Sequence, residues 1–175
     1  MNRKYLVLGI GAAIALLPFA PSTRAQRKSN GMLKLPPAVA DALKSNCLDC
    51  VTAKMTREKE NGVIIYDFEF KNGQGEMDVA ADGSVIDRET VVQMADVPAP
   101  ALESIRKVAG TGKIKQIAKD EIRAELKDGQ VMKLDAPRYV YEADLTRGNK
   151  VGEVVVTPEG QITEGPKWRR KGTKE

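Results

Sequence analysis

The chain has 175 residues, with 28 lysines and arginines, 24 aspartates and glutamates, and a formal net charge of +4. It contains no histidine, so the commonest general base and metal ligand of proteins is missing. The sequence also lacks a nucleophile elbow, a phosphate-binding loop and a dinucleotide-binding fingerprint. These absences predict a protein that is not an enzyme and that uses no cofactor and no metal.

The N-terminal segment has the three parts of a secretory signal peptide. A basic start is followed by an apolar run from Tyr5 to Ala20 and by a small residue, Ala25, at the expected cleavage point. A membrane anchor would need about 20 apolar residues, and this run is shorter and is broken by Pro18. We therefore expect residues 1–25 to be removed and the mature protein to be periplasmic or secreted.

Removal of this segment would change the charge balance. The remaining chain carries 25 positive and 24 negative side chains, and residues 32–166 carry 18 positive and 23 negative ones. An acidic folded region argues against a nucleic-acid surface, in spite of a sequence pI near 9.0. The excess cations lie mainly in residues 167–175, which we expect to form a solvated basic tail.

Two proline-led segments predict helices. Residues 36–43 begin with two prolines, which are tolerated in a first helical turn, and place Val39 and Leu43 on one face. Residues 98–109 repeat this pattern, with apolar side chains at Leu102, Ile105 and Ala109.

Each predicted helix is followed by strand patterns that occur twice in the chain. Residues 66–70 alternate between apolar and acidic types and correspond to residues 141–145, and residues 75–79 correspond to 152–156. Glycine-containing turns separate the strands, a strong hairpin signal. The second copy has about 12 extra residues, which we assign to a longer hairpin around residues 127–130.

These repeats predict an α+β fold of two tandem units. Each unit is expected to contain one helix packed on an antiparallel β-meander of about four strands. The first unit spans residues 36–90 and the second spans 96–166, after a linker at 26–35. We expect the two meanders to form neighbouring sheets, each with one apolar and one polar face.

The proline-led helix, the strand Tyr66–Phe70 and the hairpin Val79–Ile86 together resemble the PepSY domain. The tandem arrangement behind a signal peptide resembles the PepSY-like group likened to β-lactamase inhibitory protein (BLIP). The resemblance covers about residues 36–165, and the second copy departs from it by its insertion and by Ala143 at the position of Phe68. It implies an exported, non-catalytic module that binds or restrains a secreted peptidase.

Cys47 and Cys50 form the one cysteine motif of the chain, with two residues between them. Haem attachment would need a histidine after the second cysteine, and a zinc site would need further soft ligands that the chain lacks. A thioredoxin-type site would place the pair at a helix N-terminus, whereas here it follows the predicted helix. We expect a local disulfide in an oxidising compartment.

Carboxylates alternate with the buried positions of the two aromatic strands. Asp67 and Glu69 in the first copy, and Glu142 and Asp144 in the second, are therefore expected to point outward and to form a polar binding surface for a protein partner. Glu76, Asp78 and Glu153 on the following strands are expected to line the same open sheet faces. The alternative is a solvated face held by cross-strand charge pairs with lysines such as Lys54. A calcium loop around Asp82 has the wrong spacing, and a hairpin turn explains these residues.

The sequence thus predicts an exported, non-catalytic binding module that acts as an inhibitor or modulator of a periplasmic or secreted peptidase. A structural or envelope-associated assembly protein is the alternative. Neither hypothesis involves nucleic acid or stable insertion into a membrane.

Overall fold

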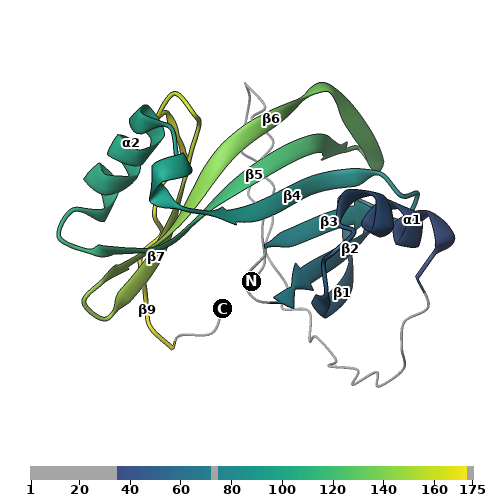
Figure 1. The fold of residues 1–175 in the computed structure, drawn as a ribbon, viewed down its shortest axis with the longest axis horizontal. Helices are drawn as coiled ribbons and strands as arrows, with labels where there is room; N and C mark the ends of the chain where they lie inside the picture. The colour runs from purple at the N-terminus through teal and green to yellow at the C-terminus, as the bar shows by residue number, and fades with distance from the viewer. Residues whose placement is uncertain (1–34, 72–74, 173–175) are drawn as a thin grey trace, which may run out of the picture. The chain divides into compact units, whose positions relative to one another are not determined.

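The computed structural model describes residues 35–71 and 75–172, so the predicted signal peptide and nearly all of the predicted linker lie outside the described residues. Leu35–Glu175 forms one compact unit. Two α-helices, a short 3₁₀ helix and nine strands occur in the described ranges (Figure 1). In chain order these are α1 (Pro37–Asn46), β1 (Thr52–Glu60), β2 (Val63–Phe70), β3 (Glu76–Ala80), β4 (Val85–Val92), η2 (Met94–Asp96), α2 (Ala99–Ala109), β5 (Lys113–Lys127), β6 (Gln130–Arg147), β7 (Lys150–Val156), β8 (Ile162–Glu164) and β9 (Arg169–Arg170).

All nine described strands belong to one antiparallel sheet. They follow chain order from β1 to β8, and β9 pairs with β7. The expectation of two neighbouring sheets is therefore wrong. β4 pairs with β5 from Asp87, opposite Ile122, to Val92, opposite Ile117, because this pairing satisfies the backbone edges that two separate meanders would leave open.

Both helices pack on the same face of this sheet. Residues directly opposite each other in a ladder share a face, and successive partners Phe68, Met77, Arg88, Glu121 and Tyr139 connect β2 to β6. α1 places Val39 on Phe68 and its neighbours, and α2 places Ile105 on a cluster that includes Tyr141. The opposite face carries no helix among the described residues.

The extra residues of the second half form a long hairpin, as the sequence predicted. We call residues 123–138 of β5 and β6 the arm. Ile122 pairs with Arg138 but Ala124 pairs with Lys133, so the strands bend at this point. The arm ends in a tight turn, in which Asp128 has a φ of 51° and Gly129 a φ of 78°.

The tip of the arm reaches the turn between β1 and β2. The Asn61 side-chain amide donates a hydrogen bond of 3.4 Å to the Leu126 carbonyl. A Cβ atom on Gly62 would lie 3.2 Å from the Gly129 Cα, so the two turns are in contact. The arm thereby brings Ala124 and Leu126, both buried, to the end of the sheet where Ile65, Ala80 and Ile86 are buried.

The start of the basic tail is part of the sheet, although we expected a solvated end. Lys150 lies opposite Arg170 and Val151 opposite Arg169, and the Lys171 N–H donates to the Asn149 carbonyl at 2.8 Å. Trp168 packs against the apolar cluster under α2. Gly152 provides the space, because a Cβ there would lie 3.0 Å from the indole.

Candidate functional site

The helix-free face of the sheet holds the four predicted binding residues. On β2, Tyr66, Phe68 and Phe70 are buried on the helix side, and Asp67 and Glu69 are half-buried on the other side. On β6, Tyr141, Ala143 and Leu145 are buried beneath α2, while Glu142 is half-buried and Asp144 is exposed. The β4–β5 pairing puts all four carboxylates on one continuous surface.

The surface also holds Glu76, Asp78 and Glu153, which were expected there, and three acidic residues that were missed in the sequence, Asp87, Glu89 and Asp120. Asp78 on β3 lies opposite Asp67 on one side and opposite Asp87 on the other. The same ladders set acid against acid three more times, in the pairs Glu69–Glu76, Glu89–Asp120 and Asp144–Glu153. We call this surface the acidic face and define it by Asp67, Glu69, Glu76, Asp78, Asp87, Glu89, Asp120, Glu142, Asp144 and Glu153.

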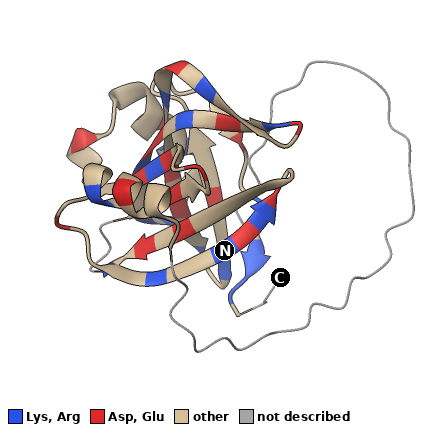
Figure 2. Ribbon diagram, turned by 90° about the vertical axis from the view of Figure 1, so that its right-hand side faces the viewer, with Lys and Arg blue, Asp and Glu red and all other residues tan. Residues whose placement is uncertain are grey.

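Opposite charges also meet on the acidic face, as the alternative of a solvated surface expects, because Lys54 and Glu69 form an ion pair there. Like charges directly opposite each other are destabilising in an antiparallel ladder, yet acid opposes acid on several neighbouring strands. In β1 the signs alternate from Arg57 to Glu60 (Figure 2), so the strand period sends the acids to this face and the bases to the helix side.

Part of the acidic face is withdrawn from solvent. Asp87 is 1% exposed and Glu89 5% exposed, and a buried carboxylate is costly unless it is hydrogen-bonded or paired. Asp67 accepts a hydrogen bond from the Thr56 hydroxyl at 3.1 Å through Oδ2, and its Oδ1 is buried.

A strand pattern could have found Asp87 and Glu89, because they alternate with Ile86 and Arg88 as Asp67 and Glu69 alternate with aromatic residues.

Lys54 on β1 and Tyr141 on β6 have shifted pKa values. The hydrogen bond to Glu69 raises the pKa of Lys54, and burial acts against it more weakly. Burial raises the pKa of the Tyr141 hydroxyl, which lies on the helix side. Both groups therefore keep their usual protonation state at neutral pH, and neither is poised for proton transfer.

The cysteine pair lies on the helix side, away from the acidic face. Cys47 and Cys50 form a disulfide with Cα atoms 5.2 Å apart, directly after α1. Arg88 points to Cys47, with Nη2 3.8 Å from Sγ. Because Cys47 packs in the apolar cluster under α1, the disulfide fixes the end of this helix against the sheet.

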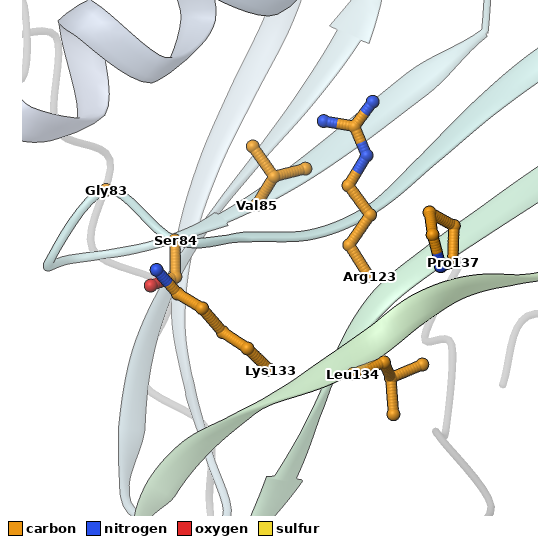
Figure 3. A pocket seen from close by; sticks show the side chains of 7 residues that line it. All are labelled: Gly83, Ser84, Val85, Arg123, Lys133, Leu134 and Pro137. Atoms are coloured by element: carbon orange, nitrogen blue, oxygen red, sulfur yellow. The ribbon is translucent and has the colours of Figure 1, made fainter.

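A pocket of about 340 Å³ lies between the β3–β4 turn and the arm (Figure 3). Arg123 lines it, but its guanidinium already donates to Glu121 and Asn46. At the turn, the Ser84 N–H donates to Asp82 at 2.8 Å, which is the hairpin geometry expected for Asp82 and Gly83. Val85, Lys133, Leu134 and Pro137 complete the lining, so the pocket is a hollow of mixed polar and apolar character.

The described residues hold neither a recognisable metal site nor a membrane-spanning helix. No cluster of three or more histidine, cysteine or acidic residues with the geometry of a metal site occurs in the described ranges. No helix among these residues is long and apolar enough to cross a membrane. What the surface offers is a set of carboxylates in fixed positions, which attract cations and basic protein surfaces.

Fold and site together define an α+β protein with two helices on one face of an antiparallel sheet and an acidic surface on the other. No family model and no curated protein matches the sequence. Solved structures with the same fold include a BLIP-like protein from Bacteroides fragilis, with 15% identity, a TM-score of 0.54, and coverage of 83% of this chain and 94% of that one.

Two more structures support the same fold. A candidate periplasmic protein from Bacteroides eggerthii has 12% identity and a TM-score of 0.55, covering 78% of this chain and 89% of the other. A DUF2874 family protein from Bacteroides uniformis has 13% identity and a TM-score of 0.53, covering 78% and 90%. The predicted likeness to the BLIP-like group is thus confirmed at the level of the fold.

Proposed function

We propose that this chain is an exported, non-catalytic binding protein that holds a basic surface of a protein partner against its acidic face. The observation that carries the proposal is the repeated opposition of acid to acid across neighbouring strands, from Asp67 on β2 to Glu153 on β7. Carboxylates held side by side concentrate negative potential on this surface, and a partner with a complementary basic patch would be attracted to it.

The partner class that fits best is a secreted or periplasmic peptidase, which the protein would inhibit or modulate. This part of the proposal draws on the resemblance to PepSY-like proteins and on the BLIP-like fold. Export follows from the predicted signal peptide at residues 1–25, and one structural neighbour is itself described as a candidate periplasmic protein. Assembly of envelope components is the alternative that the same experiment tests.

We also propose that the two halves are copies of one unit, with approximate bounds at residues 36–90 and 96–166. The support is a matching contact in each half. A Cβ on Gly83 would lie 2.8 Å from the Ala38 carbonyl oxygen of α1, and a Cβ on Gly160 would lie 2.6 Å from the Pro100 carbonyl oxygen of α2. Both glycines have positive φ, at 88° and 86°.

The test is capture from the exported fraction with three forms of the mature protein run in parallel. The first is the wild type, and the second carries Asp67→Asn and Asp144→Lys. We choose asparagine at Asp67 because its partly buried carboxyl leaves no room for a lysine. The control carries Asp41→Lys and Glu103→Lys, which change exposed residues of α1 and α2 on the helix side.

We expect a partner that the wild type and the control retain and that the acidic-face variant binds at least about tenfold more weakly. The wild type and the control should unfold at nearly the same denaturant concentration, since exposed charges contribute at most about 1 kcal/mol, and the acidic-face variant should still unfold in one cooperative transition. Equal retention by all three forms would refute the acidic face as the binding surface. Recovery of envelope components in place of a peptidase would favour the assembly alternative.

A further inference from the structure

A second charged surface, opposite in sign, lies at the end of the second half. Residues 110–116, 146–152 and 165–172 contain eight cations and no acidic residue. All eight side chains are exposed. We call this surface the basic end; its members are Lys113, Lys115, Arg147, Lys150, Lys167, Arg169, Arg170 and Lys171.

The sheet brings these cations together from three separate segments. Arg147 lies opposite Lys150 across the β6–β7 ladder, and Lys150 lies opposite Arg170 across the β7–β9 ladder. Lys113 lies opposite Thr146, next to Arg147. The basic end thus repeats, with the sign reversed, the placing of like charges on paired strands that is seen on the acidic face.

The basic end is a fixed part of the fold. Arg147 lies over the Trp168 ring, 4.6 Å from its centroid, and donates hydrogen bonds of 2.8 Å and 3.0 Å to the Val108 and Ala109 carbonyls at the end of α2. The arginines of β9 (blue in Figure 2) therefore project from a strand that the indole and the helix hold in place.

We propose that the basic end binds the headgroups of anionic phospholipids at a membrane surface. The cations lie along a strand edge and a hairpin and do not converge on one point, so they fit a spread of negative charge better than a single small anion. Each lysine or arginine near an anionic membrane contributes about 1 kcal/mol, so eight cations suffice for reversible attachment.

The fold also indicates how the protein would lie on the membrane. Trp168 is packed between Arg147 and the sheet, so the indole is occupied and the attachment would be electrostatic, without insertion. An anionic membrane would repel the acidic face and attract the basic end. Lys113 and Arg169 lie on the acidic-face side of the sheet, and Arg147 and Lys150 lie on the helix side. The protein would therefore rest on this end of the sheet, and the more distant part of the acidic face would stay open to a soluble partner. The inference does not depend on the proposed function, because the basic end has its own charges and its own test.

The experiment measures co-sedimentation of the chain from Gln26 onward, which holds the whole folded unit, with two kinds of vesicle. One contains phosphatidylcholine alone and the other a mixture of phosphatidylcholine and phosphatidylglycerol. We expect binding only to the mixed vesicles. Raising the ionic strength from about 0.01 M to about 0.15 M should weaken it, because the Debye length falls from about 30 Å to about 8 Å.

Matched variants test the place of binding. Arg169→Gln with Arg170→Gln should weaken binding to the mixed vesicles about 30-fold, from two lost cations. Arg57→Gln with Lys59→Gln removes the same charge from β1 and should change binding by less than about twofold. A circular dichroism melt of each variant verifies folding.

Three outcomes would overturn the inference. The first is no binding to mixed vesicles at low salt, and the second is equal loss in both variants, which would indicate a response to net charge alone. The third is self-association in analytical ultracentrifugation that the Arg169/Arg170 variant abolishes while vesicles remain unbound, because the acidic face of a second copy would then be the partner. Failure of partner capture by the acidic face would leave all of these results unchanged.

Discussion

The two halves of the sheet fix the start of their helices in the same way and the end of their helices in different ways. At the start, a glycine turn presses on the first helical turn in both halves, through Gly83 and Gly160. At the end, α1 is held by the Cys47–Cys50 disulfide. α2 instead ends at Gly110, with a φ of 57°, and is held by Arg147 and Trp168.

This comparison separates what the fold requires from what it tolerates. The turn that packs against the start of each helix requires glycine, because a Cβ atom in the turn would meet a backbone carbonyl oxygen of the helix. The end of the helix needs only some attachment to the sheet, and a covalent bond or an arginine–tryptophan contact serves equally. The predictions below test this distinction, from the largest expected effect to the smallest.

The largest effect is expected in the two cores. Phe68 and Ala143 occupy matching positions under α1 and α2, and both are buried. Phe68→Ala should lower the free energy of unfolding by about 3–5 kcal/mol, because it leaves a cavity. Ala143→Phe should cost about 1–3 kcal/mol through overpacking. Urea unfolding measures both, and a larger loss from Ala143→Phe would contradict this ranking.

The glycine turns come next. Gly83→Ala and Gly160→Ala should each cost about 2–5 kcal/mol, from left-handed backbone strain together with a clash against the helix carbonyl. Gly148→Ala is the matched control, since its φ is 58° and nothing lies within 4 Å of the added Cβ. The control should cost about 1–2 kcal/mol from strain alone. Equal losses at all three positions would show that the helix contact is unimportant.

A substitution that releases the end of one helix should leave amide hydrogen exchange in the other helix unchanged. Replacement of both Cys47 and Cys50 by alanine should cost about 2 kcal/mol, as expected for a very short disulfide loop, and should speed amide hydrogen exchange in α1. Trp168→Ala should speed exchange in α2 and leave α1 unchanged. Faster exchange in both helices with either variant would show that the two ends are coupled.

The smallest effect is expected at the Lys54–Glu69 ion pair. Lys54→Met should cost at most about 1 kcal/mol, because the pair is exposed. Its pKa is raised above the usual 10.5, so its contribution should be constant at neutral pH and be lost as pH rises past the raised value. Thermal melts of the wild type and the variant should therefore differ at neutral pH and converge in strong alkali.

Local patterns predicted much of this fold because they carry the periods of helix and strand. Residues 36–43 and 98–109 gave two proline-led helices close to the observed α1 and α2. The alternation around Phe68 predicted which side chains are buried, and the repeat mismatch located the extra hairpin. Each of these features depends on neighbours in the chain, which is why a single sequence reveals it.

The remaining features depend on contacts between distant segments. Nothing in the separate strands indicates that β4 and β5 pair, so neither the single sheet nor the opposition of Glu89 to Asp120 was predicted. For Trp168 the sequence left open packing against the second half or exposure to solvent, and it did not indicate the contacts with Gly152 and Arg147, which come from another hairpin. The part of the acidic face that was not predicted is therefore the one around the β4–β5 pairing, at Asp87, Glu89 and Asp120.

The contact between the arm and the β1–β2 turn has a consequence for the order of folding. The hydrogen bond from Asn61 to Leu126 joins residues 65 positions apart, so the first half emerges during synthesis well before the segment that touches its end. Until the arm arrives, this end of the sheet lacks Ala124 and Leu126 as neighbours of its apolar residues. Closing so long a loop is slow. Part of the apolar surface of the first half therefore stays exposed until the arm has formed and packed on it.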